Sequence, residues 1–335
     1  MKSPITGKEM VLKHELVEHE FRKELFKIHY LYFLCEDTGE KFEDEAIAQS
    51  NLNQIYNQYR NRHNLPFPEE IVSLREQYGL SPSKMSEVLG FGINVYRNYE
   101  SGEIPNSSNA RLIQLAQDPR EFGRLVELSN VLSEKETEKV MRKVDELLLS
   151  QGQSKFNLSS FLMGGAAADE QTGFRKPNLK KFTEMVVYFT LEAQPQLWKT
   201  KINKMLFYAD FLNFKKAAVS ISGCRYRAID MGPVPNNFNS LFDYIAENDH
   251  IDIDAIPFPN GSIGEQFLPS KTRKFDDSVL SSTERETLNE VVEKFKKVKT
   301  NQIIDLSHKE EVWEKNFKNG KSLINYLDAF RLVNI

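Results

Sequence analysis

The chain has 335 residues, of which 40% are hydrophobic and 27% charged, and its formal net charge is −4. These values are typical of a soluble globular protein with two or three domains, and they exclude a chain that is basic throughout, so any contact with nucleic acid must come from a local surface. No stretch of about 18 apolar residues predicts a membrane span, and the N-terminus lacks the apolar core of a secretory signal, so we expect a cytoplasmic protein without a membrane partner.

The first predicted element is a small β-module at residues 1–50. The stretches SPITG (residues 3–7) and CEDTGEKF (residues 35–42) have the glycine turns of two metal knuckles but lack most of the thiols. Between them, residues 11–34 alternate between polar and apolar side chains and then become apolar, which predicts a β-hairpin. We therefore expect a zinc-ribbon-like module without a full set of metal ligands.

No metal ion is expected in this module. Ser3, Thr6 and Thr38 stand where thiols would be required, and Cys35 is the only thiol near the two turns. Structural zinc sites use four nitrogen or sulfur ligands. The other possible donors lie in a stretch rich in Glu and are His14, His19 and His29. We predict that side-chain packing replaces the metal, that no cofactor is bound, and that Cys35 forms no disulfide with the distant Cys224.

Apolar residues at helical spacing mark the segment that follows the turns of the β-module. Residues 43–65 carry apolar side chains at near-helical spacing, and Pro66 and Pro68 end the pattern. Residues 51–66 are therefore predicted to form a connecting helix that leads into the next domain.

Residues 67–128 have the pattern of a helix-turn-helix domain. A first amphipathic helix ends at Gly79, and Ser81 caps a second helix that begins with a proline. Gly90 permits a tight turn before a third helix, predicted at about residues 93–100. A short helix, a tight turn and a second helix with polar residues at its N-terminal end form the arrangement that reads DNA.

The third helix has an inward and an outward side. Its inward residues are predicted to be Ile93, Tyr96 and Tyr99. Asn can pair with adenine and Arg with guanine. The predicted DNA-binding residues, drawn from the second and third helices, are Ser83, Lys84, Asn94, Arg97 and Asn98.

Residues 68–128 resemble the DNA-binding domain of MqsA-type antitoxins, a branch of the lambda-repressor-like helix-turn-helix proteins, through LSPSKMSEVLGFGINVYRNYESG and PNSSNARLIQL. The β-module lies where that family has its zinc module. The resemblance implies a base-reading Asn, which is Asn94 here, and an Arg four residues later. That position is Asn98, and the arginine is Arg97, one place earlier.

The charge of the helix-turn-helix domain limits its affinity for DNA. Residues 67–128 hold six Lys or Arg against nine Asp or Glu, a net charge of −3. Because phosphate contacts supply much of the affinity, operator binding is expected to need a dimer and neighbouring segments. A helical module that binds only protein is the alternative.

Residues 129–178 are predicted to be a helix followed by a linker. Ser133 and Glu136 form a capping-box pattern. The apolar stripe of the helix should pack on a domain or form a dimer seam, and it consists of Val140, Val144, Leu147 and Leu148. Residues 151–178 carry Gly, Ser, Ala and Gln without clear periodicity, which predicts an inter-domain linker.

Residues 179–335 are predicted to form a mostly helical domain with a short β element. The stretch TKINKMLFYADFLNFKK has apolar residues at helical spacing and predicts an amphipathic helix. Asp210, within its apolar stripe, is expected either to pair with a basic group such as Arg225 or Lys204 or to be solvated at the rim. The following SGCRYRAIDMGPVP predicts a strand-like segment that ends in a rigid Gly-Pro-Val-Pro turn.

This part of the chain resembles the Panacea domain, also called the SocA-like antitoxin domain. The pattern Lys-(Ile/Leu)-x-Lys-x-Leu-(Phe/Tyr)-Tyr-Ala-Asp-Phe, followed by Gly-x-x-Tyr-x-Ala-x-x-x-Gly-Pro-Val-Pro, is nearly intact here, and the family's ending is matched by Ser307, His308 and Trp313. The resemblance covers roughly residues 180–335. It implies an antitoxin that neutralises a protein toxin encoded beside it, or in some members a proteolytic adaptor.

No catalytic residues are predicted. Asp210, Arg225, Tyr226 and His308 could be arranged as a site, but no nucleophile elbow, carboxylate pair or phosphate-binding glycine loop accompanies them. His308 is expected near a helix start, as a capping or core-edge residue. Because Tyr and Arg are favoured interface anchors, we predict instead a toxin-facing surface. It comprises Asp210, Arg225, Tyr226, Arg227 and Phe238.

The sequence predicts an α+β, mostly α protein, and the two resemblances imply that it acts as an antitoxin of a type II toxin–antitoxin system. Its C-terminal domain is expected to bind the toxin, and its helix-turn-helix to repress its own operon. The expected partners are the toxin, operator DNA and a second copy of the chain, because operators usually mirror two-fold symmetry. The alternatives are a stand-alone transcriptional regulator and an adaptor that delivers a client protein to a protease.

Overall fold

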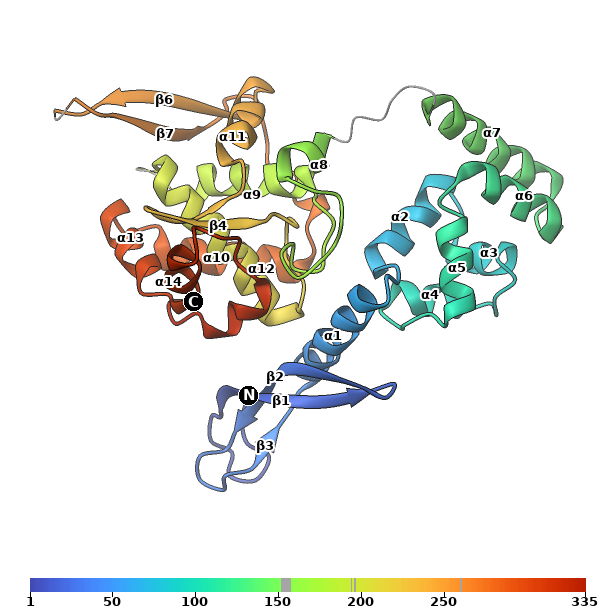
Figure 1. Ribbon diagram of the computed structural model, residues 1–335, viewed down its shortest axis with the longest axis horizontal. Helices are drawn as coiled ribbons and strands as arrows, with labels where there is room; N and C mark the ends of the chain where they lie inside the picture. The colour runs from blue at the N-terminus through green and yellow to red at the C-terminus, as the bar shows by residue number, and fades with distance from the viewer. Residues whose placement is uncertain (152–157, 194, 196, 260) are drawn as a thin grey trace. The chain divides into compact units, whose positions relative to one another are not determined.

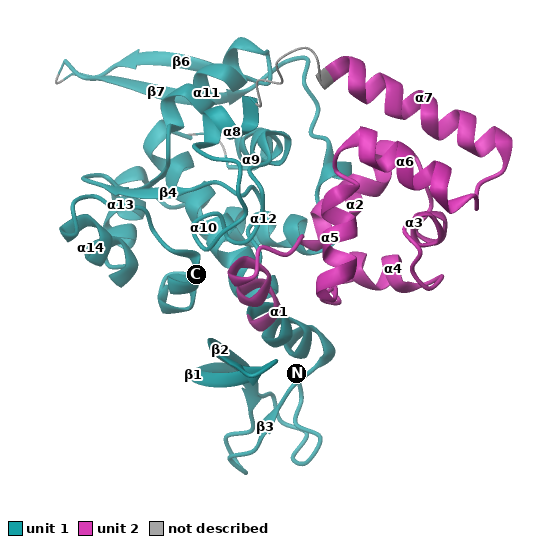
Figure 2. Ribbon diagram, turned by 45° about the vertical axis from the view of Figure 1, so that its right-hand side comes forward, with its two compact units in different colours: residues 1–54, 157–335 teal, residues 55–156 magenta. Residues whose placement is uncertain are grey.

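A computed structural model of the chain divides into two compact units (Figure 1, Figure 2). Unit 1 comprises residues Met1–Gln54 and Asn157–Ile335, and unit 2 comprises Ile55–Phe156. The structure describes residues 1–151, 158–193, 195, 197–259 and 261–335. The predicted fold class, α+β with mostly helices, is confirmed.

The N-terminal segment of unit 1 is a long β-hairpin. Strands β1 (Val11–Phe21) and β2 (Glu24–Leu34) pair antiparallel along their whole length, and β3 (Lys41–Phe42) adds to β2. Arg22 and Lys23 form the turn, with φ of 51° and 66°. Two positive φ values match the twist of the flanking strands. The predicted hairpin at residues 11–34 is confirmed.

The two glycine turns beside this hairpin bring hydroxyl groups to a thiol. Ser3 Oγ accepts a hydrogen bond from the backbone N–H of Thr6 (3.2 Å), and Thr6 Oγ1 lies 3.7 Å from Cys35 Sγ. Hydrogen bonds from the Ser3 and Thr38 hydroxyls lower the pKa of the Cys35 thiol to about 7. Three hydroxyls therefore surround one thiol. In the described part of the chain, no three His, Cys, Asp or Glu residues are grouped so that they could hold a metal ion.

The hairpin packs within unit 1 against the C-terminal end of the chain. The ring of His29 stacks on Phe330 with centroids 4.7 Å apart, and His14 Nδ1 lies 3.2 Å from His29 Nδ1. Burial lowers the pKa of His29 to about 4, so this contact is made by a neutral imidazole at pH 7. From helix α1 (Glu45–Arg62), Asn53 Nδ2 donates to the carbonyl of Ala217 (3.3 Å).

Unit 2 is helical. After the end of α1, its helices are α2 (Pro68–Tyr78), α3 (Pro82–Val88), α4 (Val95–Glu100), α5 (Ser107–Leu115), α6 (Pro119–Ser129) and α7 (Glu134–Gln151). The rings of Tyr78 and Phe122 stack in the core, 3.7 Å apart. Val140 and Val144 of α7 are buried in the same core. The apolar stripe of α7 therefore covers its own unit.

The C-terminal part of unit 1 surrounds one buried helix. Its helices are α8 (Leu158–Met163), α9 (Leu179–Glu192), α10 (Lys199–Ala217), α11 (Phe238–Glu247), α12 (Ser282–Phe295), α13 (Thr300–His308), α14 (Glu311–Lys318) and the 3₁₀ turns η1 (Asp277–Val279) and η2 (Tyr326–Arg331). Its strands form two hairpins, β4 (Tyr226–Ile229) with β5 (Gly232–Pro235), and β6 (Ile251–Pro257) with β7 (Ile263–Pro269).

The prediction that α10 is amphipathic is wrong. Every side chain from Lys201 to Phe214 is buried, because α9, α12, α13, β5 and η2 pack around the helix. The Gly-Pro-Val-Pro segment also differs from the prediction, because it is strand β5 rather than a turn. Ala228 pairs with Pro233 and Tyr226 with Pro235. Prolines are tolerated here because β5 is an edge strand of a two-stranded sheet.

The segment expected to be an inter-domain linker also differs from its prediction in part. Residues 152–157 lie outside the described residues, but the rest of residues 158–178 folds into unit 1. Thr172 is fully buried, and Phe174 is 2% exposed with its ring 6.0 Å from Phe214. After α8, residues 164–178 lack periodicity because they pack as irregular chain, with Phe174 against Phe214 of α10.

Candidate functional site

The segment from α3 to α4 is fixed by hydrogen bonds from buried side chains. Ser81 Oγ accepts from the N–H of Lys84, which caps α3 as predicted. Ser86 Oγ accepts from the N–H of Tyr96 (2.9 Å), and the Tyr96 hydroxyl donates to the carbonyl of Ile71 (2.8 Å). These two bonds tie the start of α4 to α3 and α2, so the exposed side of α4 has a defined orientation.

Three of the predicted DNA-binding residues lie on that exposed side. Asn94 is the N-cap residue of α4, and Arg97 and Asn98 lie within the helix with their side chains exposed. Tyr96 and Tyr99 face inward as predicted. The prediction that Ile93 faces inward is wrong, because α4 begins two residues later and leaves Ile93 62% exposed.

The other two predicted DNA-binding residues are less available. Ser83 and Lys84 are half-buried on α3. Lys84 Nζ lies 3.1 Å from Glu87 Oε2, and this contact raises the pKa of the lysine. Arg97, the other cation among the predicted residues, makes no such ion pair within the described residues.

In unit 1 a fully buried polar site is built around Asp210 of α10. Its carboxylate accepts hydrogen bonds from the N–H groups of Ile221 (2.7 Å) and Ser222 (2.8 Å), from Ser222 Oγ (2.5 Å) and from the Tyr226 hydroxyl (2.8 Å). Burial raises the pKa of Asp210, and these hydrogen bonds oppose that shift. The prediction that Asp210 pairs with Arg225 or Lys204, or is solvated at the rim, is wrong, because hydroxyl and backbone donors satisfy it in the interior.

A second buried polar group lies on the same helix. Lys204 Nζ donates to the carbonyl of Pro233 (3.1 Å), and burial lowers the pKa of the lysine to about 7. A Cβ at Gly232 would lie 2.4 Å from Ser307 Oγ and 2.6 Å from Lys204 Cε, so only glycine fits where β5 passes this lysine.

His308 lies near this group. It is the last residue of α13, so the expected position at a helix start is wrong, and its ring stacks on Trp313 with centroids 4.0 Å apart. Its Nε2 is buried and has no hydrogen-bond partner among the described residues. Desolvation lowers the pKa of His308, and the nearby charge of Lys204 lowers it further.

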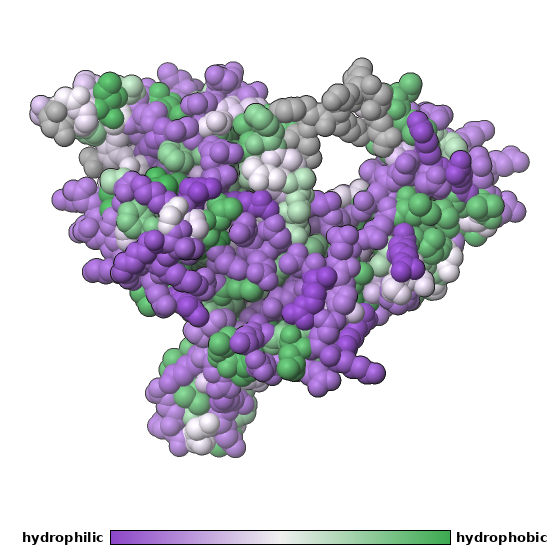
Figure 3. All heavy atoms as spheres, in the orientation of Figure 1, coloured by the Kyte–Doolittle hydropathy of each residue, from purple (hydrophilic) through white to green (hydrophobic). Residues whose placement is uncertain are grey.

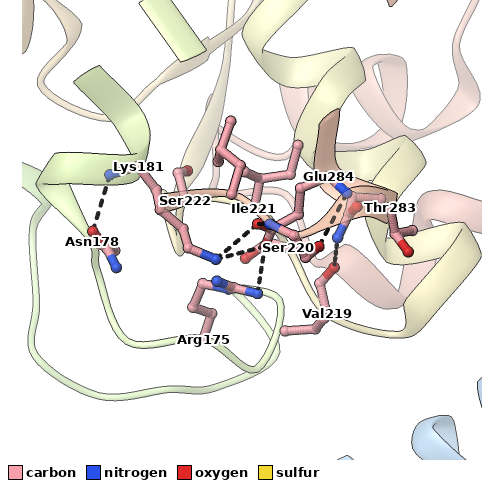
Figure 4. A network of polar contacts seen from close by, with 12 residues as sticks. Arg175, Asn178, Lys181, Val219, Ser220, Ile221, Ser222, Thr283 and Glu284 are labelled. Carbon is pink, nitrogen blue, oxygen red and sulfur yellow. Dashed lines mark hydrogen bonds and ion pairs between the residues drawn. The ribbon is translucent and has the colours of Figure 1, made fainter. Parts of the chain in front are cut away.

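Sequence reasoning missed a buried ion cluster around Glu284. Figure 4 shows Arg175 and Lys181 converging on this carboxylate, with Arg175 Nη2 at 2.9 Å and Lys181 Nζ at 2.7 Å from Glu284 Oε1. Glu284 also accepts from the N–H of Ser281 in a capping box. The capping-box pattern of Ser281 and Glu284 is a local signal that could have been found, whereas nothing in the sequence near Arg175 indicates its partner.

The five predicted toxin-facing residues do not form one surface. Asp210 and Tyr226 are both fully buried, so a partner cannot touch them in this structure, and that part of the prediction is corrected. Arg225 is tied to Asp169 by an ion pair, and Arg227 donates to the carbonyl of Lys321. Phe238 is half-buried, 5.6 Å from Lys199 Nζ. Toxin contact by Arg225, Arg227 and Phe238 stays a prediction.

The fold and these sites define a compact, mostly helical domain whose buried polar residues hold the structure together. Residues 202–314, from α10 to α14, match the family model described as "Antitoxin SocA-like, Panacea domain". No curated protein matches the chain. The match supports a general role as an antitoxin of a toxin–antitoxin system, and the matched family is not known as a family of enzymes.

No helix in the described ranges of the chain is both long and apolar enough to span a lipid bilayer. Both cysteines are free and buried, with Cys35 in the N-terminal module and Cys224 beside the Asp210 site.

Proposed function

We propose that this protein is the antitoxin of a type II toxin–antitoxin system and that its C-terminal domain neutralises a protein toxin encoded by the adjacent gene through direct binding. The observation that carries the proposal is the family match over residues 202–314, which coincides with the helices packed around α10. Neutralisation by binding needs a stable surface of about 800 Å² and no chemistry. The polar groups of this domain suit that role, because Asp210 and Glu284 are engaged in the interior.

Co-expression tests this proposal. The product of the adjacent gene, induced alone, is expected to arrest growth. Co-expression of this protein is expected to restore growth, and the two proteins are expected to co-purify. Toxin half-life is measured in parallel, because an antitoxin that acts by binding leaves the toxin intact while a proteolytic adaptor hastens its decay. If growth is not restored, the proposed function is wrong.

We also propose that α3 and α4 form a helix-turn-helix that binds the operator of the same operon as a dimer. Asn94, Arg97 and Asn98 are exposed on α4 and carry the donors and acceptors that read base edges. The buried bond from Tyr96 to Ser86 supports the proposal because it fixes the orientation of α4.

The double variant Asn94→Ala/Arg97→Ala is expected to lose roughly tenfold or more in affinity for the upstream promoter, since each base contact contributes about 1–3 kcal/mol. The slope of log affinity against log salt concentration should also fall by about one, the change expected when one cationic contact is lost. Fluorescence anisotropy with promoter and scrambled duplexes measures both. Arg142→Ala removes the same charge from an exposed position on α7 and is the control. Equal affinities for all three proteins would exclude α4 as the recognition helix.

A further inference from the structure

The hairpin of β6 and β7, residues 251–269, is an arm with a fixed root. At the root Ile251 and Phe267 are buried, and the ring of Phe267 packs against Phe242 with centroids 4.8 Å apart. The N–H of Phe267 donates to the carbonyl of Leu197 (2.8 Å), which joins the outer edge of β7 to the chain before α10. The distal half extends beyond the helices of unit 1 (Figure 1).

The distal end of the arm carries apolar side chains. Phe258 is 39% and Ile263 is 70% exposed, and apolar residues are visible near this end in Figure 3. Phe258 packs on Trp198 with centroids 5.2 Å apart. Gly264 makes room for it, because a Cβ there would lie 2.5 Å from the Phe258 ring. The end of the arm is therefore held in place while it presents apolar surface.

The outer edge of β6 is available for pairing. Phe258 N–H donates to the carbonyl of Ser262, which makes this a hydrogen-bonded pair and sets the alternation along the ladder. By that alternation the N–H and C=O groups of Ile253 and Ala255 point away from β7. Among the strands that the structure describes, β7 alone pairs with β6. Such an edge can accept another strand.

The surface around this edge is acidic, and most of its carboxylates have no counterion among the residues that the structure describes. From Asp243 to Glu265 the sequence has six Asp or Glu and no Lys or Arg. Glu265 pairs with Lys199. The other five are exposed and make no ion pair with any described residue, and they are Asp243, Glu247, Asp249, Asp252 and Asp254.

We propose that the outer edge of β6 binds the toxin by pairing with an extended segment that carries Lys or Arg at alternate positions. Main-chain hydrogen bonds to Ile253 and Ala255 would supply affinity, and Asp252 and Asp254 would select the cations. A second copy is disfavoured because β6 against β6 would bring these carboxylates close to one another. Nucleic acid is repelled by the same charges. This inference rests on the proposed antitoxin function and adds where on this protein the toxin would bind.

Charge reversal on the arm tests the proposal. Asp252→Lys/Asp254→Lys is expected to weaken binding of the purified product of the adjacent gene by roughly tenfold or more, measured by calorimetry. The matched control Glu286→Lys/Asp305→Lys makes the same change of charge at exposed positions on α12 and α13 and is expected to bind as the wild type does. Circular dichroism confirms that each variant is folded.

A second variant tests the backbone pairing. Ala255→Pro removes an outward-pointing N–H without removing a bond between β6 and β7, and it is also expected to weaken binding. If both arm variants bind as the wild type does while the wild type rescues growth, the arm is not the interface but the antitoxin function stands. If the wild type neither binds nor rescues, the proposed function and this inference both fail.

Discussion

Replacement of Asp210 by alanine is expected to lower the free energy of unfolding of unit 1 by roughly 3–5 kcal/mol, because it leaves three buried hydrogen-bond donors without an acceptor. The carboxylate accepts four hydrogen bonds in the interior, and the variant leaves the N–H groups of Ile221 and Ser222 and the hydroxyl of Tyr226 without an acceptor. Each buried donor left unsatisfied costs about 1–3 kcal/mol. Urea denaturation followed by tryptophan fluorescence measures the change, because Trp198 and Trp313 both lie in unit 1.

Two variants separate the hydrogen bonds of Asp210 from its volume and charge. Asp210→Asn keeps the shape and one acceptor oxygen, so it should lose less stability than the alanine variant. Asp305→Ala removes a carboxylate from an exposed position on α13 and should change stability by less than about 0.5 kcal/mol. A loss below about 1 kcal/mol for Asp210→Ala would contradict the view that this network holds α10 to β4.

The second large effect is a dependence of stability on pH that comes from Lys204. Burial lowers the pKa of this lysine to about 7 from 10.5. Between these two values the unfolded chain binds more protons than the folded one, so folding becomes more favourable as the pH rises from 7 toward 10.5. The slope is at most about 1.4 kcal/mol per pH unit for one group. Below pH 7 the buried ammonium is present in the folded state and its cost is constant.

Lys204→Met removes this contribution. Urea denaturation of the wild type and the variant at pH 7, 8 and 9 should show the wild type gaining stability relative to Lys204→Met as the pH rises. Lys297→Met, at an exposed position after α12, is the surface control. A difference between wild type and Lys204→Met that does not change with pH would show that Lys204 is not the titrating group.

The sequence predicted those features of unit 2 that depend on local signals. Ser81 caps α3 because a hydroxyl at that position can reach a free N–H of the first turn, and Tyr96 and Tyr99 face inward because of helical spacing. The start of α4 was placed two residues early. Helix boundaries depend on backbone geometry that composition does not show. Because of this error, Ile93 was expected to face inward, whereas its side chain is exposed.

In unit 1 the predictions failed where tertiary packing decides. An apolar stripe on α10 suggested one buried face, but its polar positions are buried too, because Lys204 and Asp210 find partners from strands and loops later in the chain. No local pattern encodes these partners. The arm of β6 and β7 was also missed, although the register of its strands follows their alternation, because short strands with Asp at alternate positions give a weak signal.

Unit 1 consists of two segments that are far apart in the sequence, and this has a consequence for synthesis on the ribosome. His29 emerges early, whereas Phe330, on which it stacks, emerges about 300 residues later. At translation rates of about 5–20 residues per second, the N-terminal hairpin waits on the order of tens of seconds for its partner. Ile55–Phe156 is contiguous and can fold as soon as it leaves the exit tunnel. A chain interrupted before Phe330 would therefore release a folded unit 2 attached to an N-terminal hairpin whose contact face has nothing to cover it.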